Sequence, residues 1–349
     1  MKILVLNAGS SSLKYKLFID MRVVADGIIE SITNYRDGIL EVEEQIKKVG
    51  VKSLSLLDGV GHRVVHGGEL FKESVLVTKE VIDTVRSLIP LAPLHNPANL
   101  EGILMIQDEA PSLRQVAVFD TAFHQTIPQK AYMYALPYEL YEGEGIRRYG
   151  FHGTSHHFVA KKASKLLDKR LTDTNLITLH LGNGASVCAI KNGKSVDTSM
   201  GFTPLEGLIM GTRSGDIDPA ILLYLTRELK YSTEEIDNLI NKKSGLLGIS
   251  GESDMRQIHK MIEQGDKKAK LALEMFVYRI RKYIGAYSTI LGRVDALIFT
   301  GGIGENDLIV REMILEDFDI LSFVICTDEE LEIALETNRV LNVSKNSTL

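Results

Sequence analysis

Two stretches of the sequence follow the same plan, and this repetition restricts the folds open to the chain. "LNAGSSSLKYKLF" and "LHLGNGASVCAIKNGK" each contain an apolar strand, a turn of small residues (Gly, Asn, Ala and Ser) and a second strand. Repetition of such a unit indicates a duplicated domain. With 349 residues, the chain is long enough for two packed domains.

Apolar runs alternate with helical segments along the rest of the chain, which is typical of an α/β architecture. Phe276, Ile280, Tyr283, Ile284 and Tyr287 recur at steps of three and four residues and predict a helix over 267–291, with its tyrosines in the core or in a subunit contact. The predicted strands are 3–6, 13–18, 116–119, 176–180, 187–190 and 296–299.

The composition excludes several classes of protein. The net charge of −6 is spread evenly, without the basic patch of a nucleic-acid-binding protein. No apolar run approaches the roughly 20 residues that cross a bilayer, and the N-terminus has no signal-peptide pattern. Cys188 and Cys326 lie outside any CxxC motif, so neither a disulfide framework nor a structural zinc site is expected. We expect a cytoplasmic protein with no nucleic-acid or membrane partner.

The two repeated turns have the composition of phosphate-binding loops. Small residues leave backbone N–H groups open to a ligand, while serine hydroxyls and Lys14 add donors and positive charge. A third segment, "ALIFTGGIGEN", follows a buried strand with glycines and is predicted to be a loop that allows close approach of a ligand. The chain lacks the P-loop, GxGxxG and GxSxG patterns. Each turn alone could be a plain hairpin, but the three segments together favour a nucleotide.

Further motifs concentrate histidine and arginine. Arg213 lies among glycines and hydroxyl residues, which favours a ligand over a surface ion pair. His152 and His156 are four residues apart, but no third ligand follows, so a zinc site is not expected. Other histidines are candidates for the hydrogen bonds around a site rather than for catalysis: His62, His66, His95 and His124.

Taken together, the motifs resemble the acetate kinase family. NAGSSSLK, HRVVHGGE, FDTAFH, RRYGFHGTSH, HLGNGAS, GTRSGD and FTGGIGEN occur in the family's order from residue 1 to about residue 340. The resemblance implies an α/β fold of two duplicated domains, as in the sugar kinase, heat-shock ATPase and actin superfold, with the active site in the interdomain cleft. It implies an N-terminal domain of residues 1–122 plus 331–349 and a C-terminal domain of residues 123–330.

The activity that the resemblance implies is the reversible transfer of a phosphoryl group from ATP to acetate, which gives acetyl phosphate and ADP. The family's cofactor is Mg²⁺, for which Mn²⁺ substitutes, and its members form homodimers. Two alternatives stay open: a propionate kinase with the same mechanism, and a nucleotide-binding regulator that has lost catalysis. One methylene changes substrate discrimination by only about 1–3 kcal/mol, so the sequence does not separate acetate from propionate.

The resemblance also implies roles for individual residues. The catalytic residues would be Asp120, His152 and Arg213. The acyl substrate would be bound by Arg63, Val65, Leu94, Phe151 and Pro204. ATP would be bound by Ser10, Ser12, Lys14, His180, Leu181, Gly182, Asn183, Gly184, Asp254, Met255, Arg256, Gly302, Ile303, Gly304, Glu305 and Asn306. The metal would be held by Asn7 and Glu329.

The sequence departs from the family near Glu329. Cys326 and Asp328 replace the proline and asparagine of the family's PTNEEL motif, and the stretches 306–327 and 27–60 are shorter than in most members. Glu329 therefore has two interpretations. As a metal ligand it would face the site; as a first-turn acid it would only favour a helix dipole, in a helix capped by Thr327 with Glu330 completing a capping box.

Overall fold

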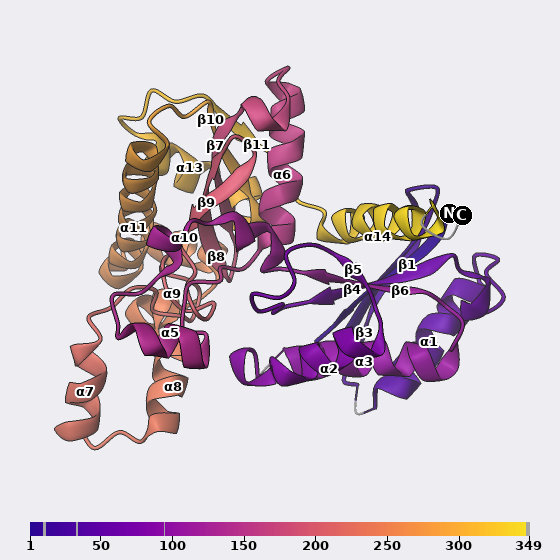
Figure 1. Ribbon diagram of the computed structural model, residues 1–349. Helices are drawn as coiled ribbons and strands as arrows, with labels where there is room; N and C mark the ends of the chain where they lie inside the picture. The colour runs from indigo at the N-terminus through magenta and orange to yellow at the C-terminus, as the bar shows by residue number, and fades with distance from the viewer. Residues whose placement is uncertain (10–11, 33, 94, 347–349) are drawn as a thin grey trace. The chain divides into compact units, whose positions relative to one another are not determined.

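The computed structural model describes residues 1–9, 12–32, 34–93 and 95–346 (Figure 1). The chain separates into two compact units. Unit 1 comprises Met1–Gln125, Gly153–Phe158 and Asp328–Leu349, and unit 2 comprises Thr126–His152 and Val159–Thr327. The domain limits expected from the sequence, 1–122 with 331–349 and 123–330, lie close to the borders of these units. The division into two functional domains stays a prediction.

Unit 1 contains a six-stranded sheet in the order β3-β2-β1-β4-β6-β5. Its first two strands form the hairpin around the first turn, in which Asn7 lies opposite Lys14. The pairs β1–β4 and β4–β6 are parallel, and the other pairs are antiparallel. The strands are β1 (Lys2–Ala8), β2 (Ser12–Ile19), β3 (Arg22–Glu30), β4 (Gly59–Val64), β5 (Val75–Leu76) and β6 (Gln115–Phe119).

Helices cover both faces of this sheet, which explains the continuous apolar run at the N-terminus. Leu4 and Leu6 point into the core under α1 and α3, whereas Ile3 and Val5 pack with residues of α14 on the opposite face. Figure 1 shows α14 across the sheet from α1, α2 and α3. The elements are α1 (Tyr35–Lys47), η1 (Leu54–Leu56), α2 (Lys79–Ser87), η2 (Ile89–Leu91), α3 (Asn96–Glu109), η3 (Ala122–Thr126) and α14 (Glu329–Asn346).

A glycine on β4 lets α14 lie close to the sheet. A Cβ atom added at Gly61 would lie 2.8 Å from Ile333 Cγ2 on α14, a distance that packed carbon atoms do not adopt. The absence of a side chain therefore fixes the depth at which α14 packs, and with it the position of the acidic residues at the start of that helix.

Unit 2 contains a five-stranded sheet in the order β11-β10-β7-β8-β9. Its β7–β8 hairpin surrounds the second turn, and β7–β10 and β10–β11 are parallel. Five strands of unit 1, taken as β6-β4-β1-β2-β3, have the same order and directions. This topology confirms the duplicated α/β fold that the repeated motif predicts. The strands are β7 (Asn175–Leu181), β8 (Ala185–Lys191), β9 (Lys194–Thr198), β10 (Ala296–Thr300) and β11 (Ser322–Val324).

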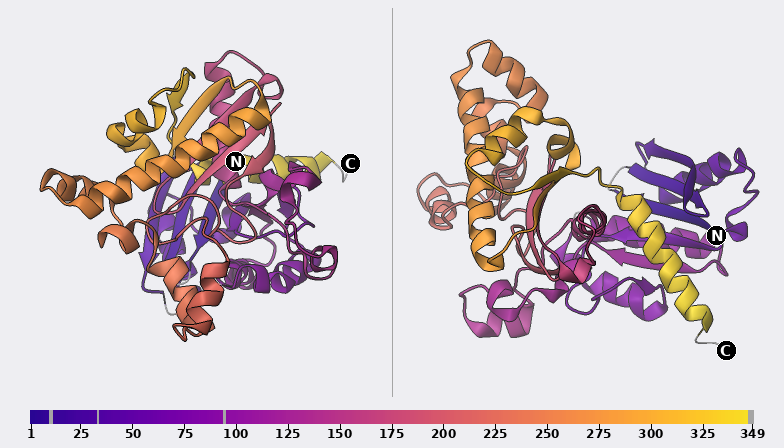
Figure 2. Two further views of the ribbon diagram at one scale, coloured as in Figure 1. Left: turned by 90° about the vertical axis from the view of Figure 1, so that its left-hand side faces the viewer. Right: turned by 90° about the horizontal axis from the view of Figure 1, so that it is seen from above.

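The long helix of unit 2 is α11 (Lys267–Leu291), as predicted from its apolar stripe. Asp266 caps its start with a carboxylate that accepts from two backbone N–H groups, and the helix lies across the second sheet (Figure 2). No helix in the described part of the chain is long and apolar enough to cross a membrane. The other elements are α4 (Gln129–Tyr132), α5 (Tyr138–Glu144), α6 (Gly153–Leu166), η4 (Leu171–Asp173), α7 (Ala220–Arg227), α8 (Thr233–Lys242), α9 (Gly245–Ser250), α10 (Met255–Glu263), α12 (Gly301–Asn306) and α13 (Leu308–Leu315).

Candidate active site

In unit 1, oxygen atoms from three parts of the chain converge on the guanidinium group of Arg63. Asp120, directly after β6, accepts from Arg63 Nη2 at 2.6 Å and from Nε at 3.3 Å. Asn7 Oδ1 on β1 lies 3.5 Å from Nη1, and Glu329 Oε2 lies 3.9 Å from Nε. Four residues to which the sequence assigns substrate, catalytic and metal roles therefore form one cluster. Asn7, Arg63 and Asp120 lie at the ends of the adjacent strands β1, β4 and β6, and Glu329 lies at the start of α14.

The charges in this cluster are strongly coupled. Burial raises the pKa of Asp120, and although Arg63 and the hydroxyl of Thr154 oppose this shift, the pKa remains above its usual value. Burial alone would lower the pKa of Arg63, but Asp120 and Glu329 outweigh that effect and raise it. Arg63 is therefore a permanent cation that already binds a carboxylate group, which is the type of group that a small organic acid presents.

Acidic residues at the start of α14 hold the first hairpin. Glu330 forms ion pairs with Lys14 at 2.5 Å and with Lys16 at 3.3 Å, and Asp328 pairs with Lys16 at 3.1 Å. Lys14 thus has a carboxylate partner, and its role toward a phosphate remains a prediction.

The predicted cap of α14 is wrong. The helix begins at Glu329, so the capping residue is Asp328, whose Oδ1 accepts from Leu331 N at 3.0 Å. Thr327 is not the cap, and Glu330 is engaged with lysines instead of completing a capping box. Aspartate and asparagine are both strong capping residues, so Asp328 retains the capping ability of the asparagine that it replaces in the family motif.

In unit 2, His152 and Arg213 approach the second turn from two directions. A Cβ atom added at Gly184 would lie 3.6 Å from His152 Nε2 and 3.7 Å from Arg213 Nη1. His152 has a left-handed backbone (φ 58°), its Nδ1 lies 2.9 Å from the hydroxyl of Ser186, and its ring stacks on His180 with centroids 4.2 Å apart. A nitrogen from each side chain therefore faces the backbone of the turn that the sequence assigns to phosphate.

Arg213 is a half-buried cation without an anionic partner among the described residues. Its Nη1 donates to the carbonyl of Pro204 at 2.9 Å, and burial lowers its pKa. A guanidinium group remains charged despite such a shift, and burial of an unpaired charge is unfavourable. This arrangement is typical of a site that is completed by an anionic ligand.

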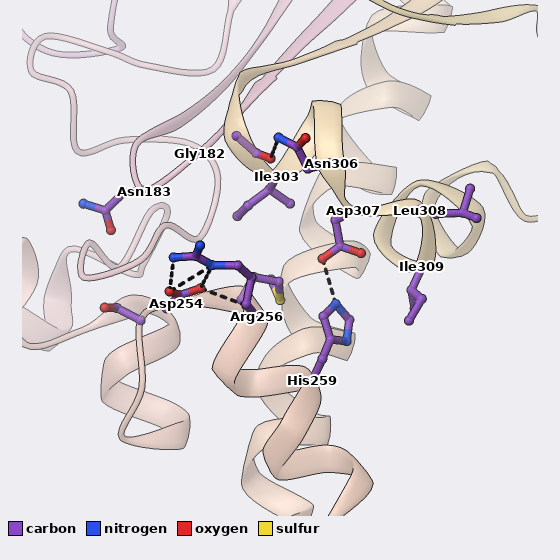
Figure 3. A pocket seen from close by; sticks show the side chains of 13 residues that line it. Gly182, Asn183, Asp254, Arg256, His259, Ile303, Asn306, Asp307, Leu308 and Ile309 are labelled. Atoms are coloured by element: carbon purple, nitrogen blue, oxygen red, sulfur yellow. Dashed lines mark hydrogen bonds and ion pairs between the residues drawn. The ribbon is translucent and has the colours of Figure 1, made fainter. Parts of the chain in front are cut away.

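A cavity of about 820 Å³ lies beside the same turn, within unit 2 (Figure 3). It has a volume in the range of small-molecule sites. The predicted nucleotide-binding residues that line it are Gly182, Asn183, Asp254, Met255, Arg256, Gly302, Ile303 and Asn306. Five others, His180, Leu181, Gly184, Gly304 and Glu305, do not line it.

The glycine segment after β10 is a short helix, α12 (Gly301–Asn306), and the predicted loop is wrong in this respect. Glu305 Oε1 accepts from the backbone N–H groups of Gly301 at 3.0 Å and of Thr327 at 3.1 Å. Its side chain therefore holds the start of its own helix and the strand-to-helix connection that leads to α14.

The motifs missed part of the cavity wall: Ser253, His259, Asp307, Leu308 and Ile309. His259 Nε2 lies 2.7 Å from Asp307 Oδ2 (Figure 3). Asp307 Oδ1 also caps α13 by accepting from Val310 N. The sequence contains a signal for His259: it follows the predicted ligand Arg256 by about one helical turn on α10, so both side chains lie on the same face of that helix.

The predicted acyl-binding residues are distributed over both units. Val65 is buried and donates its N–H to Asn99 Oδ1 at 3.0 Å, and β4 ends one residue before it. Phe151 is buried in unit 2, where Pro204 is half-buried. Leu94, assigned to this pocket, and Ser10, assigned to the first phosphate loop, lie outside the described residues.

Two buried histidines of unit 1 make the stability of the protein dependent on acid. Burial lowers the pKa of both His62 and His66 to about 4. In the unfolded chain the two imidazole rings bind protons near pH 6.5, whereas in the folded protein they stay neutral down to about pH 4. The folded state therefore has its full stability above about pH 6.5 and loses stability as the pH falls toward about 4. We expect a loss of roughly 2 kcal/mol per histidine at about pH 5.

Denaturant unfolding at about pH 7.5 and about pH 5 measures this loss. His62 Nε2 lies 2.7 Å from Gln115 Oε1, and His62→Gln keeps a donor at that position without the titration. The variant should retain about half of the pH dependence of the natural protein if the two histidines contribute equally. An unchanged pH dependence would contradict the assignment to His62.

Comparison with known proteins identifies relatives along the whole chain. The family model described as "Acetokinase family" matches residues 28–348. An acetate kinase of Sulfurovum sp. is 51% identical over 395 aligned positions, which cover 98% of this chain and 99% of that protein. An acetate kinase of Halothermothrix orenii is 50% identical over 397 positions, with 98% and 100% covered. Because these alignments are longer than the 349-residue chain, the chain has internal deletions relative to both proteins.

Solved structures match equally well. Porphyromonas gingivalis acetate kinase superposes with a TM-score of 0.92 at 44% identity, covering 97% of this chain and 99% of that chain. A propionate kinase from Francisella tularensis superposes with a TM-score of 0.92 at 42% identity, with the same coverage. A putative N-acetylmannosamine kinase from Listeria monocytogenes, at 13% identity and a TM-score of 0.53, shares the fold only.

Proposed function

Because the chain belongs to the acetokinase family, we propose that it catalyses the reversible transfer of the γ-phosphoryl group of ATP to acetate, giving acetyl phosphate and ADP. The observation that carries this proposal is the half-buried Arg213, which has no carboxylate partner among the described residues and faces Gly184 together with His152. These two side chains would stabilise the charge on the phosphoryl group during in-line transfer.

The acceptor needs no strong base. A carboxylic acid with a pKa near 4 is already ionised at neutral pH, so the barrier lies in bringing two anions together. We assign Arg63 to the acetate carboxylate, with Val65, Leu94, Phe151 and Pro204 around the methyl group. Asp120 then orients Arg63 and the metal rather than removing a proton, since its side chain is already committed to Arg63.

The nucleotide would bind in unit 2. The cavity beside the second turn is lined by apolar side chains of Ile303, Leu308 and Ile309 and by the charged pair Arg256–Asp254. An apolar wall suits a nucleobase, and the backbone N–H groups of the turn suit phosphate oxygens. Three further predicted residues, Ser10, Ser12 and Lys14, would contact the phosphates.

The oxygen atoms around Arg63 fit Mg²⁺, the metal that the family implies. An amide oxygen and carboxylates are ligands of the kind that Mg²⁺ takes, usually with one or two carboxylates and the substrate phosphates completing its shell. Asn7, Asp120 and Glu329 would hold the ion, which would neutralise phosphate charge, and Mn²⁺ would replace it. The described residues contain no cluster of three or more His, Cys, Asp or Glu side chains suited to a tighter metal site.

Glu329→Gln tests the metal assignment. The variant should raise the Mg²⁺ concentration for half-maximal rate by about tenfold, since one charged ligand is lost. The melting temperature should change little, because Glu329 is 21% exposed and lies 3.9 Å from its nearest cation. Titration of the rate with Mg²⁺ and a thermal melt of each protein measure both quantities. An unchanged Mg²⁺ dependence with a lower melting temperature would make Glu329 a helix-stabilising acid only.

Trapping of acyl phosphate with hydroxylamine tests the proposed reaction. The purified protein, ATP and Mg²⁺ are incubated with acetate, propionate or butyrate, and kcat/KM is measured for each acid. The highest value with acetate is expected, and the highest value with propionate would assign the acid differently while leaving the mechanism intact. The absence of product with all three acids would overturn the proposal in favour of a nucleotide-binding regulator.

We also propose a homodimer that acts in the cytoplasm, where ATP is available. Helix α7 supports the dimer: it contains no buried residue, and Ile221, Leu223 and Tyr224 are exposed by 46%, 53% and 58%. Contiguous apolar residues on one exposed helix are typical of a protein interface. The molecular mass in solution, by light scattering, checks this proposal, and a monomer at micromolar concentration would overturn it.

A further inference from the structure

An ionic cluster in unit 2, outside the assigned site, holds the segment on which Arg213 rests. Arg148 Nη1 donates to three successive carbonyl oxygens, those of Thr198 at 2.7 Å, Ser199 at 3.2 Å and Met200 at 3.2 Å. One guanidinium group therefore fixes the beginning of the segment 198–206 at the end of β9.

The end of the same segment is fixed by the same arginine. Arg148 Nη2 donates to Glu206 Oε1 at 2.6 Å. The other oxygen of Glu206 accepts from the hydroxyl of Tyr134, and that hydroxyl accepts from Phe202 N at 2.9 Å. Arg148, Glu206 and Tyr134 thus contact the segment at its start, middle and end; these three residues are called the loop clamp below.

The clamped segment has little freedom. The carbonyl of Gly201 accepts from Tyr149 N at 3.0 Å and from Gly150 N at 3.2 Å. A Cβ atom added at Gly201 would collide with the carboxylate of Glu206. The clamp side chains are partly buried, with Arg148 15% and Glu206 31% exposed. Charge-assisted hydrogen bonds in such surroundings are stronger than those on the surface.

The segment in turn carries the carbonyl of Pro204, which accepts from Arg213 Nη1. Because no carboxylate in the described residues pairs with Arg213, this carbonyl is its main oriented partner. We infer that Arg148, Glu206 and Tyr134 are positioning residues for the phosphoryl transfer, acting through Pro204 to aim the guanidinium group of Arg213. This inference rests on the proposed function and adds residues to it that no motif assigned.

Glu206→Ala removes the common partner of Arg148 and Tyr134. We expect kcat to fall by about tenfold to a hundredfold, because a displacement of the Arg213 guanidinium group by about 1 Å has an effect of this size. The KM for ATP should stay within about twofold of the value for the natural protein. Glu206→Gln keeps one amide oxygen that can accept from Arg148, but its NH2 group replaces the oxygen that accepts from Tyr134, so it should restore only part of kcat. Tyr134→Phe is a milder variant that remains informative if Glu206→Ala does not fold.

A matched control separates positioning from stability. Asp295 accepts from Lys169 at 2.8 Å and from Asn175 N at 2.7 Å at the start of β7, away from the clamp. Asp295→Asn should lower the melting temperature while leaving kcat unchanged. If Glu206→Ala and Tyr134→Phe also lowered the melting temperature without changing kcat, the loop clamp would serve stability only and the inference would be wrong.

The decisive measurement combines the clamp with Arg213. In the Arg213→Ala background, Glu206→Ala should have no further effect on kcat, because the group that it positions is gone. An equal fold-loss in both backgrounds would overturn the inference. Failure of the proposed function is a different result, since the natural protein would then form no acyl phosphate at all.

Discussion

Arg213→Ala should lower kcat by about a thousandfold or more while leaving ATP affinity nearly unchanged. Arginine residues that face the transferring phosphoryl group contribute about 10³- to 10⁵-fold, and they act on charge that develops only during transfer. Arg213→Lys should restore little, since an ammonium group lacks the planar fork of guanidinium. Steady-state kinetics and calorimetric titration with ATP measure both quantities.

The same variant should be at least as stable as the natural protein. Arg213 is half-buried and pairs with no carboxylate in the part of the chain that the structure describes, so its removal relieves an unfavourable charge. Arg281 on α11, paired with Asp317 at 3.1 Å on the surface, is the control, and Arg281→Ala should leave kcat unchanged. A loss in kcat of less than about tenfold for Arg213→Ala would remove Arg213 from the transition state.

Asp120→Asn should reduce kcat by about a hundredfold or more and also destabilise the protein. The amide cannot balance the charge of Arg63, whose remaining ion-pair partner among the described residues would be Glu329 at 3.9 Å. Removal of one member of a buried pair costs about 3–5 kcal/mol, and we expect about 2 kcal/mol here because Arg63 is 23% exposed.

Kinetics at several Mg²⁺ concentrations and denaturant unfolding test Asp120→Asn. Asp173, paired with Arg170 at 2.8 Å on the surface of unit 2, provides the control, and Asp173→Asn should change neither quantity appreciably. If Asp120→Asn retained kcat within about tenfold, the carboxylate would serve the structure of the cluster rather than the reaction.

The fold was largely predictable because its signals are local. The apolar runs that predicted strands lie within β1, β2, β6, β7, β8 and β10, and the helix predicted over 267–291 is α11. The repeated strand–turn–strand motif predicted the duplication, since each sheet is built outward from one such hairpin. Periodicity and turn composition contain this information without any long-range contact.

The parts of the site that were not predictable depend on contacts between distant residues. Glycine content suggested a loop at 301–306, but the carboxylate of Glu305 stabilises a helix there by accepting from Gly301 N. Lys14 has the composition of a phosphate ligand, and only the packing of α14 brings Glu330 to it. The loop clamp joins Tyr134, Arg148 and Glu206 across 72 residues, a pairing that no local pattern contains.

The cap at Asp328 has a consequence for how the length of this chain can change. Consecutive residues of a helix point about 100° apart, so Glu329 and Glu330 face Arg63 and the lysines only in one rotational phase of α14. That phase is set locally, by the carboxylate of Asp328 on Leu331 N. Residues can therefore be lost from the stretch before Thr327 without rotating the helix, whereas one residue gained or lost within its first turn would redirect every acid that follows. Of the two stretches that the sequence predicts to be shortened, 306–327 lies in the tolerated position, before the residue that sets the phase of α14.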